Sequence, residues 1–333
     1  MFNTPIDDLD YNLKTSSIAQ NRYIEPKNSK LLISESKKII KFSQYIETLQ
    51  EQSVFIFNKS TVRNVRIKTN KVDTQGKIEL FVLVIKNDYQ AEVLIKSSGK
   101  IKIGDTLNTE IAEIKILNKD ASTYTIEFSE NVNSLIDRFG TVPLPPYIKD
   151  DSSKYKDYIN EFSSGGFSVA SSTAGLHFTL DMIEQLKFNG HEVIFINLDI
   201  NLGTFKPIDT EIVENYKIHS EYYRIEESDY KKILSLKQSG YKIVQVGTTV
   251  LRTLETVFNT GVYEGMSNLF ITPGYKFNIG DYLITNFHAP KSTLLSIVKS
   301  IYGDNWKELY EYAQNNNLKF LSFGDAVIFK IDE

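Results

Sequence analysis

The residues from Ser171 to Phe178 combine side chains that could bind an anion and transfer a proton. Hydroxyl residues, Thr173 among them, stand where a helix is expected to begin, and such an end offers free N–H groups and a positive dipole. Ala174 and Gly175 follow, and small residues let a ligand approach the backbone closely. His177 is placed to point back toward that ligand as an acid or a base. The same residues also fit a simple helix cap followed by a core histidine.

A second candidate site is the turn Gly247-Thr248-Thr249, where an expected strand runs directly into an expected helix. In open α/β sheets, ligands collect at such carboxyl ends of strands. Thr248, Thr249 and Arg252 are suited to hold a carboxylate or a phosphate, although they could also do no more than cap the helix. The sequence contains neither G-x-x-x-x-G-K nor G-x-G-x-x-G, so the turn is neither a Walker motif nor a dinucleotide fingerprint.

Two further segments place histidines near other polar residues, His219 with Glu221 and His288 with Asn286. His219, Glu221 and His288 are therefore candidates for proton transfer, together with His177. A histidine and a glutamate two positions apart are weak evidence for a metal site, because such a site needs a third ligand that we cannot place. We predict catalytic roles for these four residues and no metal ion.

The composition is that of an ordinary globular chain: 333 residues, 41% apolar and 24% charged, enough to bury a sizeable core. The absence of cysteine excludes disulfides, a thiolate zinc site and a cysteine nucleophile. The N-terminus is acidic and polar, and no apolar stretch approaches membrane-spanning length. We therefore expect a cytoplasmic protein with no membrane partner. We also expect a monomer.

Charge is unevenly distributed along the chain. The net charge of −4 argues against a surface that is basic all over. Residues 62–105, however, carry nine Lys and Arg against five Asp and Glu, a local balance of +4. This region could face phosphates, and the residues we expect to contact nucleic acid are Arg66, Lys77, Lys96 and Lys100. The alternative is a solvated β-rich surface whose charges serve solubility.

Hydrophobic patterning divides the chain into a β-rich part and an α/β part. Short β-prone segments broken by Gly, Asn, Asp and Ser fill residues 55–130 and predict a small antiparallel barrel or sandwich. From about Ser152 the pattern changes to helices that alternate with strands. Apolar residues from Leu176 to Leu186 predict a helix that Asn189-Gly190 would end, and residues 192–198 predict a buried strand.

The same alternation continues to the end of the chain. Ser228 would cap a helix, and Pro290 would lie in the first turn of another. The expected strands lie at residues 241–246, 268–272, 281–287 and 323–331.

We therefore predict an α/β protein with an inserted β domain. Residues 1–60 and 150–333 would form a larger α/β domain with helices around an open, barrel-like sheet rich in parallel strands. Residues 61–149 would form an inserted all-β barrel domain. The prolines of Val142–Ile148 favour extended chain and mark the return linker.

Many of these segments resemble, in order and spacing, the motifs of the S-adenosylmethionine:tRNA ribosyltransferase-isomerase family, over almost the whole chain. The segments that carry the resemblance are Ile18-Ala19-Gln20, Leu31-Leu32, Gly76-Lys77-Ile78-Glu79, Pro143 to Ile148, Thr173 to Phe178, Gly203-Thr204-Phe205, His219 to Tyr222, Val246 to Thr249, Arg252, Pro273-Gly274, Thr285 to His288, Ser292-Thr293-Leu294 and Phe323 to Ala326.

The resemblance implies an enzyme that moves the ribosyl part of S-adenosylmethionine onto the aminomethyl group of a 7-deazaguanine at a tRNA wobble position. The product is epoxyqueuosine, and adenine and methionine are released. The sulfonium acidifies the neighbouring carbon, so a base can start the rearrangement, while the substrate amine must be neutral to attack. We expect the donor to lie between the two turns described above, held by Thr173, Ala174, Gly175, Gly247, Thr248, Thr249 and Arg252.

Four motifs depart from the family pattern. Asn58 to Val62 reads Asn-Lys-Ser-Thr-Val where the family has Asn-Asp-Thr-Arg-Val, and Leu198 to Asn201 reads Leu-Asp-Ile-Asn where it has Leu-His-Val-Gly. Tyr158-Ile159-Asn160 replaces Tyr-Gln-Thr, and Ser171-Ser172 replaces Ala-Pro. The acceptor-side positions that change are Lys59, Thr61, Ile159 and Asp199. The alternative function is therefore a paralogue that uses S-adenosylmethionine with a different, non-tRNA acceptor.

Overall fold

A computed structural model describes residues 3–120, 123–149, 151–201, 203 and 206–331. The chain divides into two compact units. The larger unit comprises Met1–Thr61 and Pro145–Glu333, and the smaller one comprises Val62–Leu144. Helices occur together with parallel and antiparallel strands, so the mixed α/β class predicted from the sequence is confirmed.

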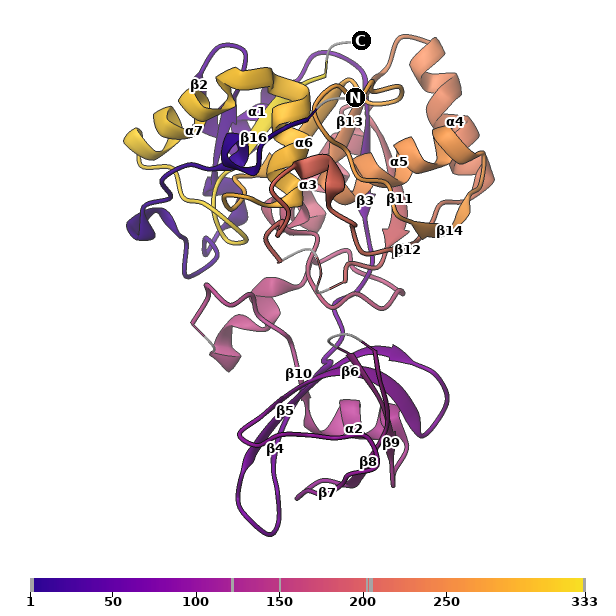
Figure 1. Cartoon of the computed structure of the whole chain (residues 1–333). Coiled ribbons are helices and arrows are strands. Elements are labelled where there is room, and N and C mark those ends of the chain that lie inside the picture. The colour runs from indigo at the N-terminus through magenta and orange to yellow at the C-terminus, as the bar shows by residue number, and fades with distance from the viewer. Residues whose placement is uncertain (1–2, 121–122, 150, 202, 204–205, 332–333) are drawn as a thin grey trace. The chain divides into compact units, whose positions relative to one another are not determined.

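The larger unit is built on a mixed sheet. Its strands are β1 (Lys30–Ile33), β2 (Lys38–Lys41), β3 (Ser53–Asn58), β11 (Glu192–Leu198), β12 (Glu221–Arg224), β13 (Lys242–Val246), β14 (Glu264–Ser267), β15 (Tyr282–Asn286) and β16 (Ala326–Lys330). Within the described residues the order is β14-β12-β11-β3-β13-β15-β16-β1-β2 (Figure 1). Strands β11, β3, β13 and β15 are parallel neighbours, so their carboxyl ends share one edge of the sheet.

The central strand β3 shows why this sheet is covered on both faces. All six of its residues are buried. Val54 and Ile56 belong to one apolar cluster, and Phe55 and Phe57 belong to another. Near-continuous apolar runs of this kind are typical of parallel strands with helices on each side.

Helices of the larger unit pack against both faces of the sheet. They are α1 (Phe42–Thr48), α3 (Leu180–Phe188), α4 (Glu227–Gln238), α5 (Thr248–Thr260), α6 (Thr293–Tyr302) and α7 (Trp306–Asn315). Residues of α1 and α3 pack with Phe55 and Phe57, whereas residues of α4 and α5 pack with Val54 and Ile56. None of the helices in the described part of the chain is both long and apolar enough to cross a membrane.

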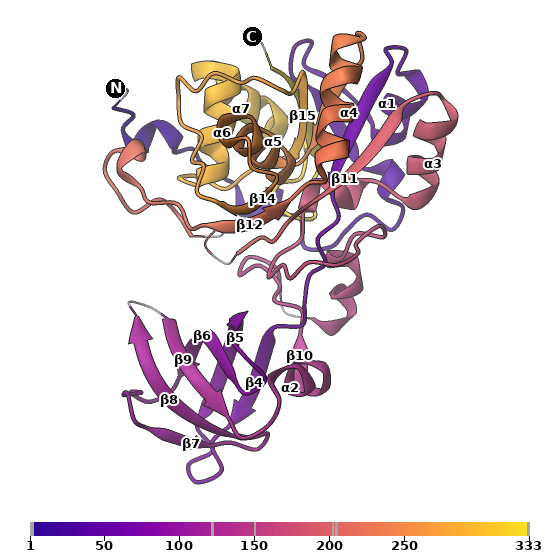
Figure 2. The same cartoon turned by 90° about the vertical axis from the view of Figure 1, so that its right-hand side faces the viewer.

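The smaller unit is a curled antiparallel sheet with one helix in its described residues (Figure 2). Its strands are β4 (Arg66–Asn70), β5 (Lys77–Ile85), β6 (Gln90–Ser97), β7 (Thr106–Asn108), β8 (Glu113–Asp120), β9 (Thr123–Phe128) and β10 (Gly140–Thr141). The order is β10-β4-β5-β6-β9-β8-β7, and an isolated bridge joins Lys71 to Thr109. Helix α2 (Val132–Phe139) buries Val132, Leu135 and Ile136.

Three helix predictions were wrong at their amino ends. Leu176 lies in a separate 3₁₀ helix, η6 (Thr173–His177), and α3 begins at Leu180, whose side chain is half exposed. Ser228 is the second residue of α4 and does not cap it. Helix α6 begins after Pro290, because the Ser292 hydroxyl accepts the N–H of Leu295 and caps it there.

Two strand predictions also need correction. Residues 268–272 do not form a strand, and the strand in this region is β14, which ends at Ser267. The first β-prone segment, which begins at Phe55, belongs to β3 in the mixed sheet of the larger unit. Both errors arise because a short apolar run does not specify its partner strand.

Candidate functional site

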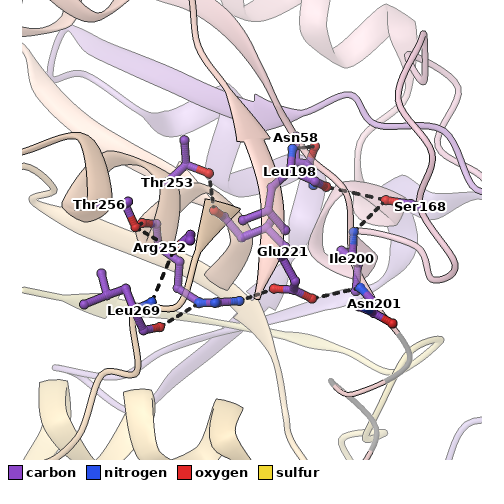
Figure 3. A network of polar contacts seen from close by, with 12 residues as sticks. Asn58, Ser168, Leu198, Ile200, Asn201, Glu221, Arg252, Thr253, Thr256 and Leu269 are labelled. Carbon is purple, nitrogen blue, oxygen red and sulfur yellow. Dashed lines mark hydrogen bonds and ion pairs between the residues drawn. The ribbon is translucent and has the colours of Figure 1, made fainter. Parts of the chain in front are cut away.

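Two buried polar side chains form hydrogen bonds between the loops at the carboxyl edge of the parallel strands. The Asn58 amide donates to the Leu198 carbonyl at 2.9 Å and accepts the N–H of Ser60 at 3.0 Å. The Ser168 hydroxyl accepts the N–H of Ile200 at 2.9 Å (Figure 3). The segments that follow β3 and β11 are therefore fixed to one another, which gives this edge a defined shape.

A cavity of about 150 Å³ opens at this edge, within the larger unit. The predicted residues that line it are Thr173, Ala174, Gly247, Thr248, Thr249 and His288. Most of its polar groups are hydroxyls, and Phe287, Leu294 and Leu321 add apolar surface. A pocket that is mostly apolar with a few convergent polar groups is suited to a small organic ligand.

Asn286 connects the first predicted turn to His177. The Thr173 hydroxyl donates to Asn286 Oδ1 at 2.9 Å. Asn286 Nδ2 contacts His177 Nε2 at 3.2 Å and donates to the Leu321 carbonyl at 3.2 Å. The Ser29 hydroxyl, which donates to a carbonyl, lies 2.9 Å from His177 Nδ1 and must therefore accept from it. His177 is thus held as the neutral tautomer with its proton on Nδ1.

His177 is buried and stacks on the Phe42 ring at 5.1 Å. Burial, with a smaller contribution from Arg22, lowers the pKa of His177 to about 3. Both ring nitrogens are engaged, and the residue is not among those lining the 150 Å³ cavity. This geometry supports a positioning role for His177, and proton transfer by it remains a prediction.

His288 differs from His177 because its side chain lines the cavity. Burial lowers the pKa of His288 to about 3, so the ring stays neutral near pH 7. The Thr285 hydroxyl lies 3.0 Å from Nε2. The backbone is also held, because Tyr11 donates its hydroxyl to the His288 carbonyl at 2.6 Å.

A second, smaller cavity of about 20 Å³ is lined by His219, Glu221 and Arg252. Arg252 donates Nη1 to Glu221 Oε2 and Nε to the Leu269 carbonyl, the latter at 3.1 Å. Glu221 Oε1 accepts the N–H of Asn201 at 2.9 Å (Figure 3). His219 is exposed. Thr248 and Thr249 line both cavities.

The two predicted glycines serve different purposes. Gly247 precedes α5 with a φ of 98°, a conformation that L side chains rarely adopt, and lines the larger cavity. Gly175 is not among the lining residues of either cavity. A Cβ at Gly175 would lie 2.8 Å from both Asn160 Oδ1 and the Phe162 ring, so its small size serves internal packing.

Sequence reasoning missed Asn286 and Ser171 as site residues. Asn286 stood in a quoted motif, but its partner His177 lies 109 residues away, and nothing local signals that contact. Ser171 also lay in a quoted motif. Ser171 is among the residues that line the larger cavity, and its buried hydroxyl has no hydrogen-bond partner among the described residues. An unpartnered buried hydroxyl is a group that a ligand can satisfy.

The four segments that depart from the family pattern contact one another in two pairs. The Ser60 hydroxyl donates to Asp199 Oδ1, and a Cβ at Gly166 would overlap both side chains. Asn160 donates to the Ser172 carbonyl at 3.1 Å. Thr204 and Phe205 lie outside the described residues.

The smaller unit carries a groove of about 570 Å³ lined by Arg66, Lys68, Lys77 and Lys96, with Glu79 and Glu110. Lys100 is not among the lining residues. Arg66 pairs with Glu79, and both Arg66 and Lys96 lie near the Phe81 ring, at 5.7 and 5.8 Å. In the described residues, no three His, Asp or Glu side chains gather as a metal site would require.

Comparison with known proteins identifies relatives along the whole chain. The family model described as "Queuosine biosynthesis protein" matches residues 6–329. A protein of Acetivibrio thermocellus named S-adenosylmethionine:tRNA ribosyltransferase-isomerase is 37% identical, with 98% of this chain and 99% of that protein covered. A protein of the same name from Natranaerobius thermophilus is 35% identical, with 98% and 99% covered.

A solved structure agrees with these relatives. It is the crystal structure of S-adenosylmethionine tRNA ribosyltransferase from Thermotoga maritima, which matches with a TM-score of 0.53 at 27% identity. The match covers 96% of this chain and 99% of that one. The chain therefore belongs to the S-adenosylmethionine:tRNA ribosyltransferase-isomerase family of queuosine biosynthesis.

Proposed function

We propose that this protein transfers and isomerises the ribosyl moiety of S-adenosylmethionine onto 7-aminomethyl-7-deazaguanine in tRNA. The product is epoxyqueuosine, and adenine and methionine are released. The observation that carries the proposal is the match to relatives of that name across almost the full length of both chains. The reaction would take place in the cytoplasm, where its tRNA substrate is found.

The 150 Å³ cavity is the proposed site of the donor's nucleoside part. Ser171, Thr173 and Thr249 offer hydroxyls to ribose, and apolar residues offer surface to adenine. Among the four candidate proton-transfer residues, His288 is the one that lines this cavity. Because its ring is neutral, His288 can accept a hydrogen bond from the donor, although its low pKa makes it a weak base.

The groove of the smaller unit is the proposed contact with tRNA. Four cationic side chains and two carboxylates line it, so it is net positive. Phosphate contacts release counterions, and removing one contacting lysine lowers the logarithmic salt slope of binding by about one unit. We expect this loss for Lys77→Ala and Lys96→Ala. Lys115→Ala, at an exposed position of β8 outside the groove, should keep the wild-type slope. Equal salt slopes in the wild-type protein and all three variants would show that the groove does not contact tRNA.

The reaction itself is tested by mass spectrometry of wobble nucleosides. Purified protein is incubated with S-adenosylmethionine and tRNA that carries the aminomethyl base. We expect epoxyqueuosine in the tRNA, with adenine and methionine released in equal amounts. Failure to form epoxyqueuosine would contradict the proposal. If adenine and methionine are released while the tRNA is unchanged, the ribosyl group has gone to water, and the assay is repeated with non-tRNA acceptors, as Lys59 and Asp199 would suggest.

A further inference from the structure

The guanidinium of Arg252 is buried but only partly paired. Its Nε donates to the Leu269 carbonyl at 3.1 Å and its Nη1 donates to Glu221. Its Nη2 has no hydrogen-bond partner in the described part of the chain, although the side chain is only 7% exposed. A buried N–H group without a partner destabilises the fold, and more so when it is charged. This nitrogen is therefore a strong candidate for a ligand contact.

The smaller cavity determines what kind of ligand group could reach Arg252. At about 20 Å³ it has room for a small polar group and not for a nucleoside. Because Thr248 and Thr249 line this cavity and the larger one, the two cavities adjoin at the amino end of α5. One extended molecule could place a small charged end in the first and a larger body in the second.

The unpartnered guanidinium nitrogen favours an anionic ligand group, although the formal charges of Arg252 and Glu221 in the smaller cavity cancel. Guanidinium groups bind carboxylates through charge-assisted hydrogen bonds. The amino end of α5, a helix of thirteen residues, adds positive potential at the same place. In S-adenosylmethionine the one anionic group is the carboxylate of the methionine part.

We infer that Arg252 Nη2 binds the methionine carboxylate of the donor in the smaller cavity, which directs the adenosine part into the larger one. The identity of the donor rests on the proposed function. Glu221 is then a positioning residue, because it holds Nη1 while the N–H of Asn201 fixes its other oxygen. The role of Glu221 in this arrangement is to orient Arg252, in place of the proton transfer that the sequence suggests.

A binding cycle between protein and ligand tests this contact. Calorimetry would compare S-adenosylmethionine with its decarboxylated analogue, on the wild-type protein and on Arg252→Met. We expect the wild-type protein to bind the analogue about 10 to 100-fold more weakly, as loss of a charged hydrogen bond implies. Arg252→Met should weaken the binding of S-adenosylmethionine by a similar factor and leave the binding of the analogue nearly unchanged.

Two controls keep the result interpretable. Arg252→Met leaves the buried Glu221 carboxylate without its cation, which could unfold the protein, so the double variant Arg252→Met/Glu221→Gln is measured as well. The inference is overturned if replacement of Arg252 weakens the binding of both ligands equally, or if the wild-type protein binds both ligands with the same affinity. If the wild-type protein binds neither ligand, the proposed function fails together with the inference.

Glu221 is tested by the kinetics of Glu221→Gln. A positioning residue predicts a raised KM for S-adenosylmethionine with kcat and its pH profile nearly unchanged. Restoring the carboxylate as Glu221→Asp should recover part of the affinity. A fall in kcat together with a shifted pH profile would assign proton transfer to Glu221 and overturn its positioning role.

Discussion

At the scale of single residues, the four histidines of this chain occupy different environments. His177 is enclosed by Ser29, Asn286 and the Phe42 ring, which fix its tautomer. His191 is buried, and neither of its ring nitrogens has a partner among the described residues. A histidine in a sequence is therefore a candidate for proton transfer, and its partners decide whether it can act.

Asn286 provides a test of the proposed positioning network. In Asn286→Asp, the side chain can no longer donate to His177 Nε2 or to the Leu321 carbonyl, and a buried carboxylate faces both acceptors. We expect a loss of about 2–4 kcal/mol in the free energy of unfolding, measured by urea titration. Asn316→Asp, at an exposed amide that donates to a backbone carbonyl, should cost less than about 1 kcal/mol. Equal losses in both variants would mean that the network adds nothing to stability.

Acid should destabilise the fold through the buried histidines. Burial lowers the pKa of His177, His191 and His288 in the folded protein, the first and last to about 3. Below the unfolded value of about 6.5, the unfolded chain binds protons that the folded chain does not, so stability falls as the pH falls from 7 toward 3. His191→Leu should make the loss of stability below about pH 6.5 less steep, by at most about 1.4 kcal/mol per pH unit.

Urea titration at several pH values measures this effect. His219→Asn, at an exposed position, is measured alongside as the matched control. A pH dependence in His191→Leu as steep as in the wild-type protein would show that His191 does not contribute.

At the scale of elements, Gly247 joins β13 to α5 and also shapes the larger cavity. Its φ of 98° suits glycine, and a Cβ would lie 3.3 Å from the Ser172 hydroxyl. Gly247→Ala should therefore cost about 1–2 kcal/mol of stability and weaken donor binding. Gly240→Ala shares the backbone cost, with a φ of 92°, but its Cβ would meet nothing within 4 Å. We expect Gly240→Ala to lower the melting temperature similarly and leave donor affinity unchanged. Equal donor affinity in both variants would exclude Gly247 from the site.

Elements with strong local signals were predictable from the sequence. The strand predicted at residues 192–198 is β11, and the turn at Gly247 opens α5 as expected. Buried runs and glycine turns determine such elements within a few residues of sequence. The start of α6 was not predictable from Pro290, since Lys291 adopts a φ of 55° and Ser292 supplies the cap.

The candidate site was predictable to a similar extent. Residues at the carboxyl ends of parallel strands, such as Thr248 and Thr249, do line the cavities, because strand order brings those ends together. Asn286 and Ser29 could not be assigned, since their contacts with His177 join segments more than a hundred residues apart. The donor-binding role of Gly175 stays a prediction, because local sequence cannot distinguish a gap for a ligand from one filled by Asn160.

At the scale of the whole molecule, the chain divides into two compact units. The apolar clusters of the larger unit are built from that unit's own described residues. The smaller unit is one continuous stretch, Val62–Leu144. Its first and last strands, β4 and β10, pair antiparallel with Thr141 opposite Arg66, so the chain enters and leaves this unit at neighbouring positions. Because the lining residues of both cavities belong to the larger unit, the smaller unit can be removed as one segment without deleting any of them.

The final prediction follows from this separation. If Val62–Leu144 is replaced by a linker of about four Gly and Ser residues, the larger unit should fold and keep its donor affinity within about threefold, because both cavities are lined by its own residues. Binding of tRNA should fall by a factor of ten or more, since the basic groove is lost. Calorimetry with S-adenosylmethionine and filter binding with tRNA would measure the two affinities, and circular dichroism would verify the fold. Loss of donor binding in a folded variant would show that the smaller unit helps to form the donor site. Full retention of tRNA binding would place the acceptor contact entirely on the larger unit, where Lys59 and Asp199 lie.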